Sequence, residues 1–441
     1  MSTPDKIGTH QKALSLNLDP TIFGSFAEIG AGQEVARWFL RVGGASGTVA
    51  KTISAYDKEV SDDLYGSGSR YVSEARLQAM LVNEWAQLLA QLHASRGATT
   101  KFFTFVDTIS ARNYAGTNEC HGWVGLRFHR QPNGPASQVI LHINLRDSSN
   151  VQQQEAVGIL GVNLIYGAFF HLGSPEEFLA SVFEELSLGQ IEIDLVEMDG
   201  PAFETWDRRA LHAFLVAGGF AEAVVFPEDN RLAPPDEILY KKAVVLAPGR
   251  FDTAGQLHAD LIEGTLAQLP PEEIEESKGG LGLFCLSILP ASPEQGSVPV
   301  KEIVEHVDNL QGLGYGVMVF RARELYTMSA FVNRYTKSRI HFAIGLNVMV
   351  RVLQDSYANL PGSLLEGIAR LFQQNVRLTA YPMTLGNVEG RAAVAGLTGW
   401  KWKETAGMVY AEDLHPPEPL NFLYRYLLAS QFILPARRSA R

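Results

Sequence analysis

The spacing of apolar residues predicts a helical first part of the chain. Between residues 73 and 94, leucines and a tryptophan recur every three or four positions, which is typical of an amphipathic helix, and Ser73 can serve as its N-cap. Two further helices are predicted over residues 23–40 and 49–64. We therefore expect a helical N-terminal region over residues 1–100, with the apolar stripe of residues 73–94 packed in a core.

The next part of the chain carries strand-like runs joined by turns. Runs at 101–106, 123–129 and 139–145 are rich in apolar and β-branched or aromatic residues, and the turn sequence 131–134 separates the last two. We expect a β-hairpin segment over residues 101–150 that leads into the main domain.

From residue 151 onward, nearly continuous apolar runs alternate with helical patterns. Such runs are typical of a mainly parallel sheet with helices on both faces, so we predict an α/β domain over residues 151–441. About eight strands can be counted from residue 139, which makes a (β/α)8-like barrel an alternative to an open doubly wound sheet. The open sheet is preferred because residues 230–240 are rich in proline and too short for a crossover helix. The predicted strands are 191–196, 223–226, 243–247, 283–289, 316–320, 340–344 and 376–381.

The segment 382–419 is rich in glycine and weakly periodic. Irregular segments of this length are usually functional or mobile. Its glycines favour a cover that opens and closes over the carboxyl edge of the sheet, and Trp400 and Trp402 supply apolar surface that a closed state would bury. The alternative is a fixed β-hairpin with both tryptophans on one face, packed on the core.

Composition and charge narrow the class of protein. Of 441 residues, 46% are hydrophobic and 19% are charged, so the chain can bury enough apolar surface to fold nearly throughout. The formal net charge of -11 argues against nucleic acid as a partner, because phosphate contacts need a basic face. The basic C-terminal residues Arg437, Arg438 and Arg441 are interpreted as a solvated tail.

Cysteine content and the N-terminus indicate a cytoplasmic protein. Cys120 and Cys285 are too few for a disulfide framework or a cysteine-based zinc site, which fits a reducing compartment. Residues 1–12 lack the basic and then apolar layout of a secretory signal. The stretch 156–170 is shorter than the roughly 20 residues that span a bilayer, so we expect a buried helix and no membrane insertion.

Two glycine-rich stretches resemble phosphate-binding motifs without completing them. Residues 30–36 lack the third glycine of a dinucleotide fingerprint and do not follow an apolar strand, so close packing is favoured over phosphate binding. The second stretch, 43–52, has alanine at two glycine positions of a P-loop. Its backbone amides, leading into a helix beside a lysine, still suit a small anion, and the alternative is a simple turn. The candidate anion-binding residues are Gly43, Gly44, Gly47, Lys51 and Thr52.

A carboxylate, a thiol and an imidazole stand together in residues 119–121, at the entry to a predicted strand. Adjacent strand residues point to opposite faces, so Cys120 and His121 are not expected to act together as nucleophile and base. His142 and Asn144 form a polar strip on the following strand, which a solvated sheet face explains.

Charged residues also follow two of the predicted strands. Glu197 and Asp199 end one strand before a Gly-Pro turn, and carboxylates at such a position suit Mg²⁺ beside a substrate phosphate. Arg321 and Arg323 follow another strand and can bind an anion. The four residues together suggest a site for a small phosphorylated ligand, and the alternative is a capped turn with exposed acids.

Several sequence blocks are distinctive as a set and extend over most of the chain. They are residues 16–20, 26–37, 51–57, 119–123, 151–156 and 239–242. In these blocks the chain resembles a widespread bacterial family whose members carry the labels nicotinate-nucleotide adenylyltransferase or TonB-dependent receptor. The first label implies a Gly-x-Phe-x-Pro-x-His pattern, whereas residues 24–28 continue without its proline or histidines. The second implies a membrane β-barrel, and the strand pattern lacks the required alternation. We take the family from the resemblance and adopt neither activity.

Two hypotheses about function follow. The first is a protein that binds, or acts as an enzyme on, a small phosphorylated or nucleotide-like ligand, with Lys51 and Arg321 as anion contacts and Asp199 as a possible Mg²⁺ ligand. The second is a non-catalytic scaffold that self-assembles through its helical N-terminal region, since an exposed apolar stripe marks an interface. A homo-oligomer is expected, most directly under the second hypothesis.

Overall fold

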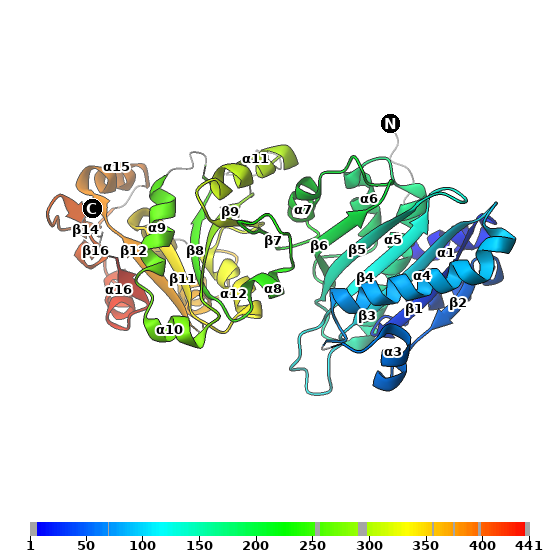
Figure 1. Ribbon diagram of the computed structural model, residues 1–441. Coiled ribbons are helices and arrows are strands. Elements are labelled where there is room, and N and C mark those ends of the chain that lie inside the picture. The colour runs from blue at the N-terminus through cyan, green and yellow to red at the C-terminus, as the bar shows by residue number, and fades with distance from the viewer. Residues whose placement is uncertain are drawn as a thin grey trace. The chain divides into compact units, whose positions relative to one another are not determined.

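The computed structural model describes residues 7–68, 70–251, 256–289, 298–354, 357–373, 375–395 and 398–436. The basic residues Arg437, Arg438 and Arg441 lie outside the described residues. The chain forms two compact units, Met1–Glu222 and Ala223–Arg441, each with its own sheet (Figure 1). The boundary at residue 222 replaces the boundaries at 100 and 150, because strands from the first hundred residues pair with the predicted hairpin in one sheet.

The first unit is built on a six-stranded sheet in the order β2-β1-β3-β4-β5-β6. The strands are β1 (Ile22–Gly30), β2 (Val49–Ile53), β3 (Lys101–Ile109), β4 (His121–His129), β5 (Ala136–Leu145) and β6 (Ile191–Asp199). Strand β1 runs parallel to both β2 and β3, whereas β3, β4, β5 and β6 are antiparallel to their neighbours. The sheet therefore combines a parallel half with an antiparallel half.

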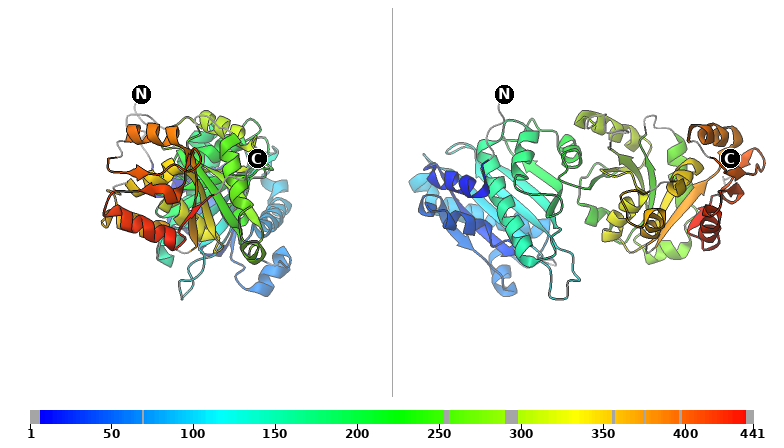
Figure 2. Two further views of the ribbon diagram at one scale, coloured as in Figure 1. Left: turned by 90° about the vertical axis from the view of Figure 1, so that its left-hand side faces the viewer. Right: turned by 180° about the vertical axis from the view of Figure 1, so that it is seen from behind.

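Helices cover both faces of this sheet (Figures 1 and 2). They are α1 (Thr9–Leu18), α2 (Val35–Arg41), α3 (Lys58–Tyr65), α4 (Glu74–Arg96), α5 (Asn150–Phe170), α6 (Pro175–Val182) and α7 (Arg208–Ala217), with a short 3-10 helix η1 (Ala45–Gly47). Helix α4 crosses one face over β1, β3 and β4, and α3 packs beside it. Helix α5 covers the opposite face, with α1, α2 and α6 packed against it.

The first hundred residues are only partly helical, contrary to prediction. The helix predicted at 23–40 is strand β1 followed by α2, and the helix predicted at 49–64 is strand β2 followed by α3. Strand β1 lies inside the sheet and is buried along most of its length, so it shows no polar alternation. A short apolar run of this kind cannot be distinguished from a buried helix by periodicity.

The long amphipathic helix and the hairpin are confirmed. Helix α4 begins after Ser73, whose hydroxyl accepts a hydrogen bond from Arg76 N at 3.2 Å, as expected of an N-cap. Strands β4 and β5 pair in register around a turn in which Asn133 has a positive φ of 56°. The hairpin lies within the sheet of the first unit rather than joining two domains.

The second unit has an open seven-stranded sheet in the order β17-β12-β11-β8-β9-β10-β7. Its strands are β7 (Ala223–Phe226), β8 (Ala243–Gly249), β9 (Gly280–Ser287), β10 (Gly316–Phe320), β11 (Ile340–Gly345), β12 (Val376–Tyr381) and β17 (Ile433–Pro435). All neighbouring pairs are parallel except β10 with β7. The chain winds from β8 to β10 in one direction and from β11 to β17 in the other, so the doubly wound open sheet is confirmed and the barrel is wrong for the described strands.

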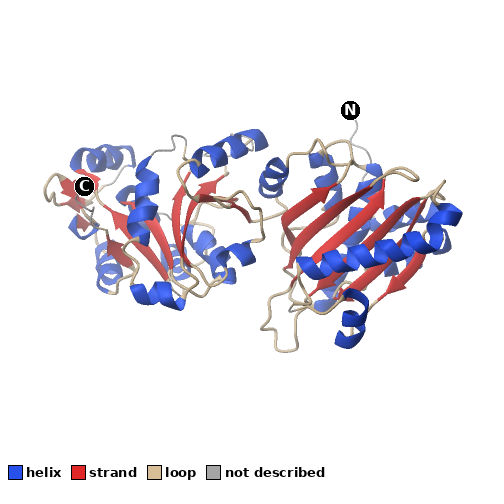
Figure 3. Ribbon diagram, in the orientation of Figure 1, coloured by secondary structure: helices blue, strands red, loops and turns tan. Residues whose placement is uncertain are grey.

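Helices lie on both faces of the second sheet, as its apolar strands predicted. They are α8 (Pro235–Leu239), α9 (Gln256–Leu266), α10 (Pro271–Glu276), α11 (Val300–Gln311), α12 (Leu325–Tyr335), α13 (Leu346–Gln354), α14 (Ser363–Leu371), α15 (Leu385–Ala395) and α16 (Leu420–Ala429). Helix α9 lies in front of the sheet in Figure 1, and α12, drawn in yellow, lies on its other side in Figure 2. Figure 3 shows the same alternation of strands and helices along this unit.

The segment 382–419 is more regular than predicted. It contains α15, a 3-10 helix η2 (Ala411–Asp413) and two pairs of two-residue strands, β13 (Met383–Thr384) with β15 (Met408–Val409) and β14 (Lys401–Trp402) with β16 (Leu414–His415). Trp400 is buried in the core of the second unit, and Trp402 packs partly buried against it. Both tryptophans pack on the core, as the fixed alternative expects, but the described part of the segment is not the single β-hairpin of that alternative. Opening of the segment stays a prediction.

Among the helices that the structure describes, none is long and apolar enough to cross a membrane. The stretch predicted as a buried helix lies within α5, where most residues from Ala156 to Ala168 are buried.

Candidate functional site

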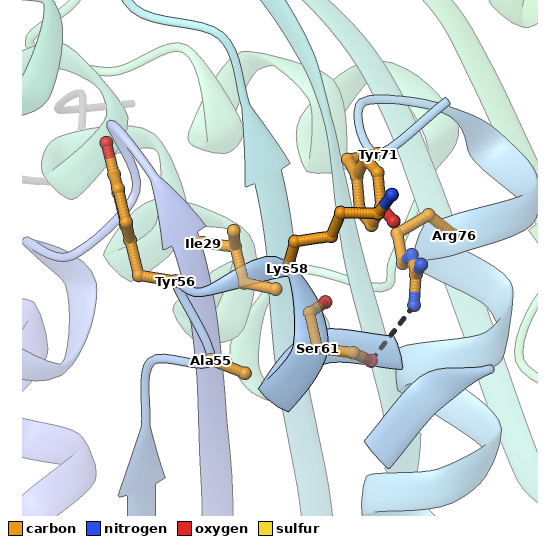
Figure 4. A pocket seen from close by; sticks show the side chains of 7 residues that line it. All are labelled: Ile29, Ala55, Tyr56, Lys58, Ser61, Tyr71 and Arg76. Carbon is orange, nitrogen blue, oxygen red and sulfur yellow. Dashed lines mark hydrogen bonds between the residues drawn. The ribbon is translucent and has the colours of Figure 1, made fainter. Parts of the chain in front are cut away.

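The parallel half of the first sheet places a pocket at the carboxyl ends of its strands. The chain passes from β1 to β2 on one side and returns to β3 on the other side of β1. Loops diverge at such a reversal of strand order, and ligands of open α/β sheets bind there. A pocket of about 290 Å³ lies beside the ends of β1 and β2 (Figure 4). This edge pocket is lined by Ile29, Ala55, Tyr56, Lys58, Ser61, Tyr71 and Arg76.

Lys58 is the exposed cation of the edge pocket. Asp57 caps α3 by accepting hydrogen bonds from Glu59 N and Val60 N, at 2.9 and 3.2 Å, and so makes Lys58 the first helical residue. Figure 4 shows the Lys58 side chain extending toward Tyr71. Among the described residues, its ammonium has no hydrogen-bond or ion-pair partner. Lys58 is therefore able to bind an anion without first losing a contact.

Arg76 is held rigidly at the other side of the edge pocket. Its guanidinium donates to Ser61 O at 3.2 Å and to Asp62 Oδ1 at 3.0 Å, and it lies over the Tyr71 ring, 4.8 Å from the centroid. The Tyr71 hydroxyl donates to Asp62 as well, at 2.9 Å from Oδ2. Asp62 neutralises part of the Arg76 charge, so Lys58 contributes most of the positive charge available to a ligand.

A pair of buried carboxylates lies behind the edge pocket, where β1 and β3 place Glu28 opposite Asp107. Glu28 accepts hydrogen bonds from Val35 N at 2.8 Å and Ala36 N at 3.1 Å, in the first turn of α2, and Asp107 accepts one from Ile29 N at 3.1 Å. Burial raises the pKa of Glu28 to about 7, and burial together with the nearby Glu28 raises the pKa of Asp107 well above its usual range. Both shifts favour the protonated forms of the two carboxyl groups.

The glycines of the turn after β1 serve this packing. A Cβ on Gly32 would lie 1.8 Å from Asp107 Oδ1, and one on Gly30, whose φ is +86°, would lie 1.9 Å from Ile109 O. Only glycine fits at either position. These contacts support the interpretation that residues 30–36 serve close packing. The stretch does follow a buried strand, β1, contrary to the prediction.

A chain of hydrogen bonds, here called the histidine chain, joins β4, β5 and β6 through His121, His142 and Asp194. His142 Nδ1 lies 2.6 Å from Asp194 Oδ1, and His142 Nε2 lies 3.1 Å from His121 Nδ1. Because Asp194 as a carboxylate accepts from Nδ1–H of His142, Nε2 of His142 accepts from His121. Nε2 of His121 is then left unprotonated. Burial and the neighbouring His142 lower the pKa of His121 to about 4, which keeps the His121 ring neutral at neutral pH.

The histidine chain corrects the interpretation of the polar strip as a solvated face, because His142 and Asp194 are buried. Asn144 donates to Asp194 Oδ2 at 2.7 Å and so belongs to the same network. Cys120 is oriented differently, with Sγ 3.8 Å from Asn118 O. Cys120 and His121 therefore do not contact each other as nucleophile and base, as expected.

The predicted anion site at residues 43–52 is not assembled as expected. Gly44 precedes the single 3-10 turn η1, which contains Gly47, and no α-helix follows, since Lys51 and Thr52 lie in strand β2. The loop is held by α1 through a bond from Asn17 Nδ2 to Gly43 O of 2.6 Å. Lys51 instead forms an ion pair with Glu84 and donates to Gln87 on α4. The simple turn is the arrangement observed here.

The strand-end charges fall on two units. Glu197 and Asp199 end β6 in the first unit, and Arg321 and Arg323 follow β10 in the second, so neither unit by itself assembles the four residues. Arg321 and Arg323 are exposed. Glu197 and Asp199 line a second pocket together with the guanidinium groups of Arg127 and Arg208.

Sequence reasoning missed Lys58, Tyr71 and Arg76. Their roles depend on recognising β1 and β2 as strands, because the pocket exists only at the ends of those strands. The available signal was Asp57, a suitable N-cap that starts a helix at residue 58 rather than at 49.

Comparison with known proteins gives limited similarity. No family model and no curated protein sequence matches the chain. Among solved structures, it is similar to the competence/damage inducible protein CihA from Agrobacterium tumefaciens, at 18% identity and a TM-score of 0.25 over 37% of this chain and 97% of that one. It is also similar to the competence damage-inducible protein A (ComA) from Klebsiella pneumoniae, at 15% identity and a TM-score of 0.25 over 37% and 94% of the two chains. At these values the likeness carries no argument about activity or ligands, and the family resemblance of the sequence stays a prediction.

Proposed function

We propose that the first unit binds a small phosphorylated or nucleotide-like metabolite in the edge pocket. The observation that carries the proposal is the Lys58 ammonium, which faces a pocket at the reversal of strand order with no partner among the described residues. Lys58 supplies the charge for a phosphate, and Ser61, Tyr71 and Arg76 lie around the same space.

Size and an aromatic ring restrict the ligand further. The volume of about 290 Å³ is at the lower limit of small-molecule sites, which span roughly 300–1,000 Å³, so a monophosphate fits better than a dinucleotide. Tyr56 lines the pocket with its side chain largely exposed, and a ring in that position can stack on a base. These features favour a sugar phosphate or a nucleoside monophosphate.

The proposal is tested by calorimetric titration of the full chain with inorganic phosphate, ribose 5-phosphate and adenosine monophosphate. Because a hydrogen bond to a charged group contributes about 1.5–3 kcal/mol, Lys58→Gln is expected to weaken binding by roughly 10- to 100-fold. Tyr56→Ala is expected to weaken the nucleotide but not the sugar phosphate. Lys301→Gln is the matched control, because Lys301 is an exposed lysine of the second unit. Equal affinities for Lys58→Gln and Lys301→Gln, or no binding of the three probes, would reject the proposal.

The hypothesis of a self-assembling scaffold loses its main support. Leu77, Leu81, Trp85 and Leu88 of the α4 stripe are buried in the first unit and are not exposed to a partner helix. Oligomeric state and cytoplasmic location stay predictions.

A further inference from the structure

A second pocket of about 320 Å³ lies in the first unit and shares no lining residue with the edge pocket. The register of the sheet places its side chains on one face, because Arg127 pairs with Gln138 and Gln138 pairs with Asp199. Glu197 follows on the same face, opposite Ile140. We call this space the polar pocket.

Two helices complete the polar pocket. Helix α4 contributes Gln78, whose Oε1 accepts a hydrogen bond from Gln138 Nε2 at 3.1 Å. Helix α7 contributes its first residue, Arg208, whose Nη2 donates to Met198 O at 3.0 Å. The side chains are thus positioned by a strand register, a helix start and an amide pair rather than by a flexible loop.

The charges of the polar pocket are of both signs. Arg127 and Arg208 supply two guanidinium groups, and Glu197 and Asp199 supply two carboxylates. Arg127 Cζ lies over the Trp85 ring, 5.6 Å from its centroid. The buried Nε of Arg127 has no hydrogen-bond partner among the described residues. Asp199 is exposed. At least one donor and one carboxylate are therefore available to a ligand.

This mixture selects among ligand classes. Mg²⁺ would be repelled by the two guanidinium groups, and a phosphate by the two carboxylates, since like charges a few ångströms apart interact unfavourably. A zwitterion satisfies both signs at once. We propose that the polar pocket binds a free α-amino acid, with its carboxylate on Arg127 and its ammonium on Asp199. In this proposal, the ammonium group of the ligand takes the place that the sequence predicted for Mg²⁺ at Glu197 and Asp199.

The lining also restricts the side chain of the amino acid. Ile140 is the apolar side chain on this face, since Met198 lies between Glu197 and Asp199 and points to the opposite face. The carboxamides of Gln78 and Gln138 offer donors and acceptors. A small or polar side chain fits these groups, so L-alanine, L-serine and L-glutamine are the probes of choice.

The test is calorimetric titration of the full chain with each amino acid and two analogues of it. The amide removes the carboxylate, and the N-acetyl derivative removes the ammonium. We expect the parent amino acid to bind at least about 10-fold more tightly than either analogue, because each analogue leaves one charged pair unmade. Binding of the analogues as tightly as the parent overturns the proposal, as does the absence of binding by all three amino acids.

Two variants locate the site. Arg127→Gln and Asp199→Asn are each expected to lower the affinity for the amino acid by about 10-fold or more. Because Asp199 is exposed, its replacement should not disturb folding. Arg37→Gln is the matched control, because Arg37 is an exposed arginine of the same unit. An unchanged affinity of Asp199→Asn for the amino acid overturns the proposal. So does the case in which no amino acid binds, but Mg²⁺ or inorganic phosphate binds and the two variants abolish that binding.

Discussion

At the scale of single residues, the polar groups inside the first unit determine much of its behaviour. Lys12 is fully buried, although it lies in an N-terminal stretch that reads as polar. Its ammonium donates to Asn163 Oδ1 at 2.7 Å and forms an ion pair with Glu184. These contacts join α1 to α5 and to the end of α6.

Removal of the Lys12 charge tests its structural role. Lys12→Met leaves Asn163 and Glu184 without their cation, and the loss of one partner from a buried pair costs roughly 3–5 kcal/mol. Glu184 is about a quarter exposed, so we expect a loss near the lower end of this range. Urea unfolding measures it as a fall in the free energy of unfolding. Lys301→Met, at an exposed position, should change it by less than about 0.5 kcal/mol. Equal effects of the two variants would contradict the assigned role.

Buried histidines make stability depend on pH. Burial lowers the pKa of His212 to about 4, and burial with the neighbouring His142 lowers the pKa of His121 to about 4, against an ordinary value of 6.5. His212 Nε2 accepts a hydrogen bond from Val196 N, which a protonated ring cannot do. Between pH 6.5 and 4 the unfolded chain binds protons that the folded chain does not, so acidification favours unfolding.

The free energy of unfolding of the full chain is therefore expected to fall as pH is lowered from 6.5 to 4. Since one pKa unit corresponds to about 1.4 kcal/mol, each histidine contributes at most roughly 3 kcal/mol to this fall. His121→Asn should show a shallower dependence than the unmodified chain in urea unfolding at a series of pH values. Replacement of exposed His10 by Asn is the control and should leave the dependence unchanged. Identical profiles for His121→Asn and the unmodified chain would show that His121 does not carry the effect.

At the scale of secondary structure elements, α4 shows how one helix presents two environments. Leu81 is fully buried and faces Gly125 of β4, where an added Cβ would lie 2.8 Å from its Cδ1. The adjacent Val82 is 57% exposed. The helical period thus places two adjacent residues in different environments, one in the core and the next in solvent.

A matched pair of substitutions measures this separation. Leu81→Asp buries a carboxylate and removes apolar contacts, so a loss of more than about 3 kcal/mol is expected, enough to unfold much of the first unit at 37 °C. Val82→Asp should change stability by no more than about 0.5 kcal/mol. Circular dichroism melting curves compare the two. If Val82→Asp is the more destabilising variant, the burial assigned to the two helix faces is wrong.

At the scale of the whole molecule, each unit has its own sheet and its own buried residues. A unit with a complete core can fold alone. We expect residues 1–222 and 223–441, expressed separately, each to give a single cooperative unfolding transition. A chain cut at residue 150 is the control. This cut separates β6 from its neighbour β5, so the resulting fragments should be poorly folded. Unfolded behaviour of both 1–222 and 223–441 would contradict the division.

The sequence by itself determined two kinds of element. One kind has a buried face and an exposed face, and the other has ends marked by capping or turn residues. It placed α4 with its Ser73 cap, the β4–β5 hairpin and the alternation from β7 to β12, because periodicity, capping and turn chemistry are local. It favoured an open, doubly wound sheet over a barrel, and the strand order of the second unit confirms this choice. Only the tertiary structure decided that Ile22–Gly30 is a strand, because burial on both faces removes the alternation that would reveal it. The same holds for the sites. Lys58 and Tyr71 line one pocket, and Arg127 and Asp199 line another. Strand order and register bring such residues together, and no local pattern in the sequence links them.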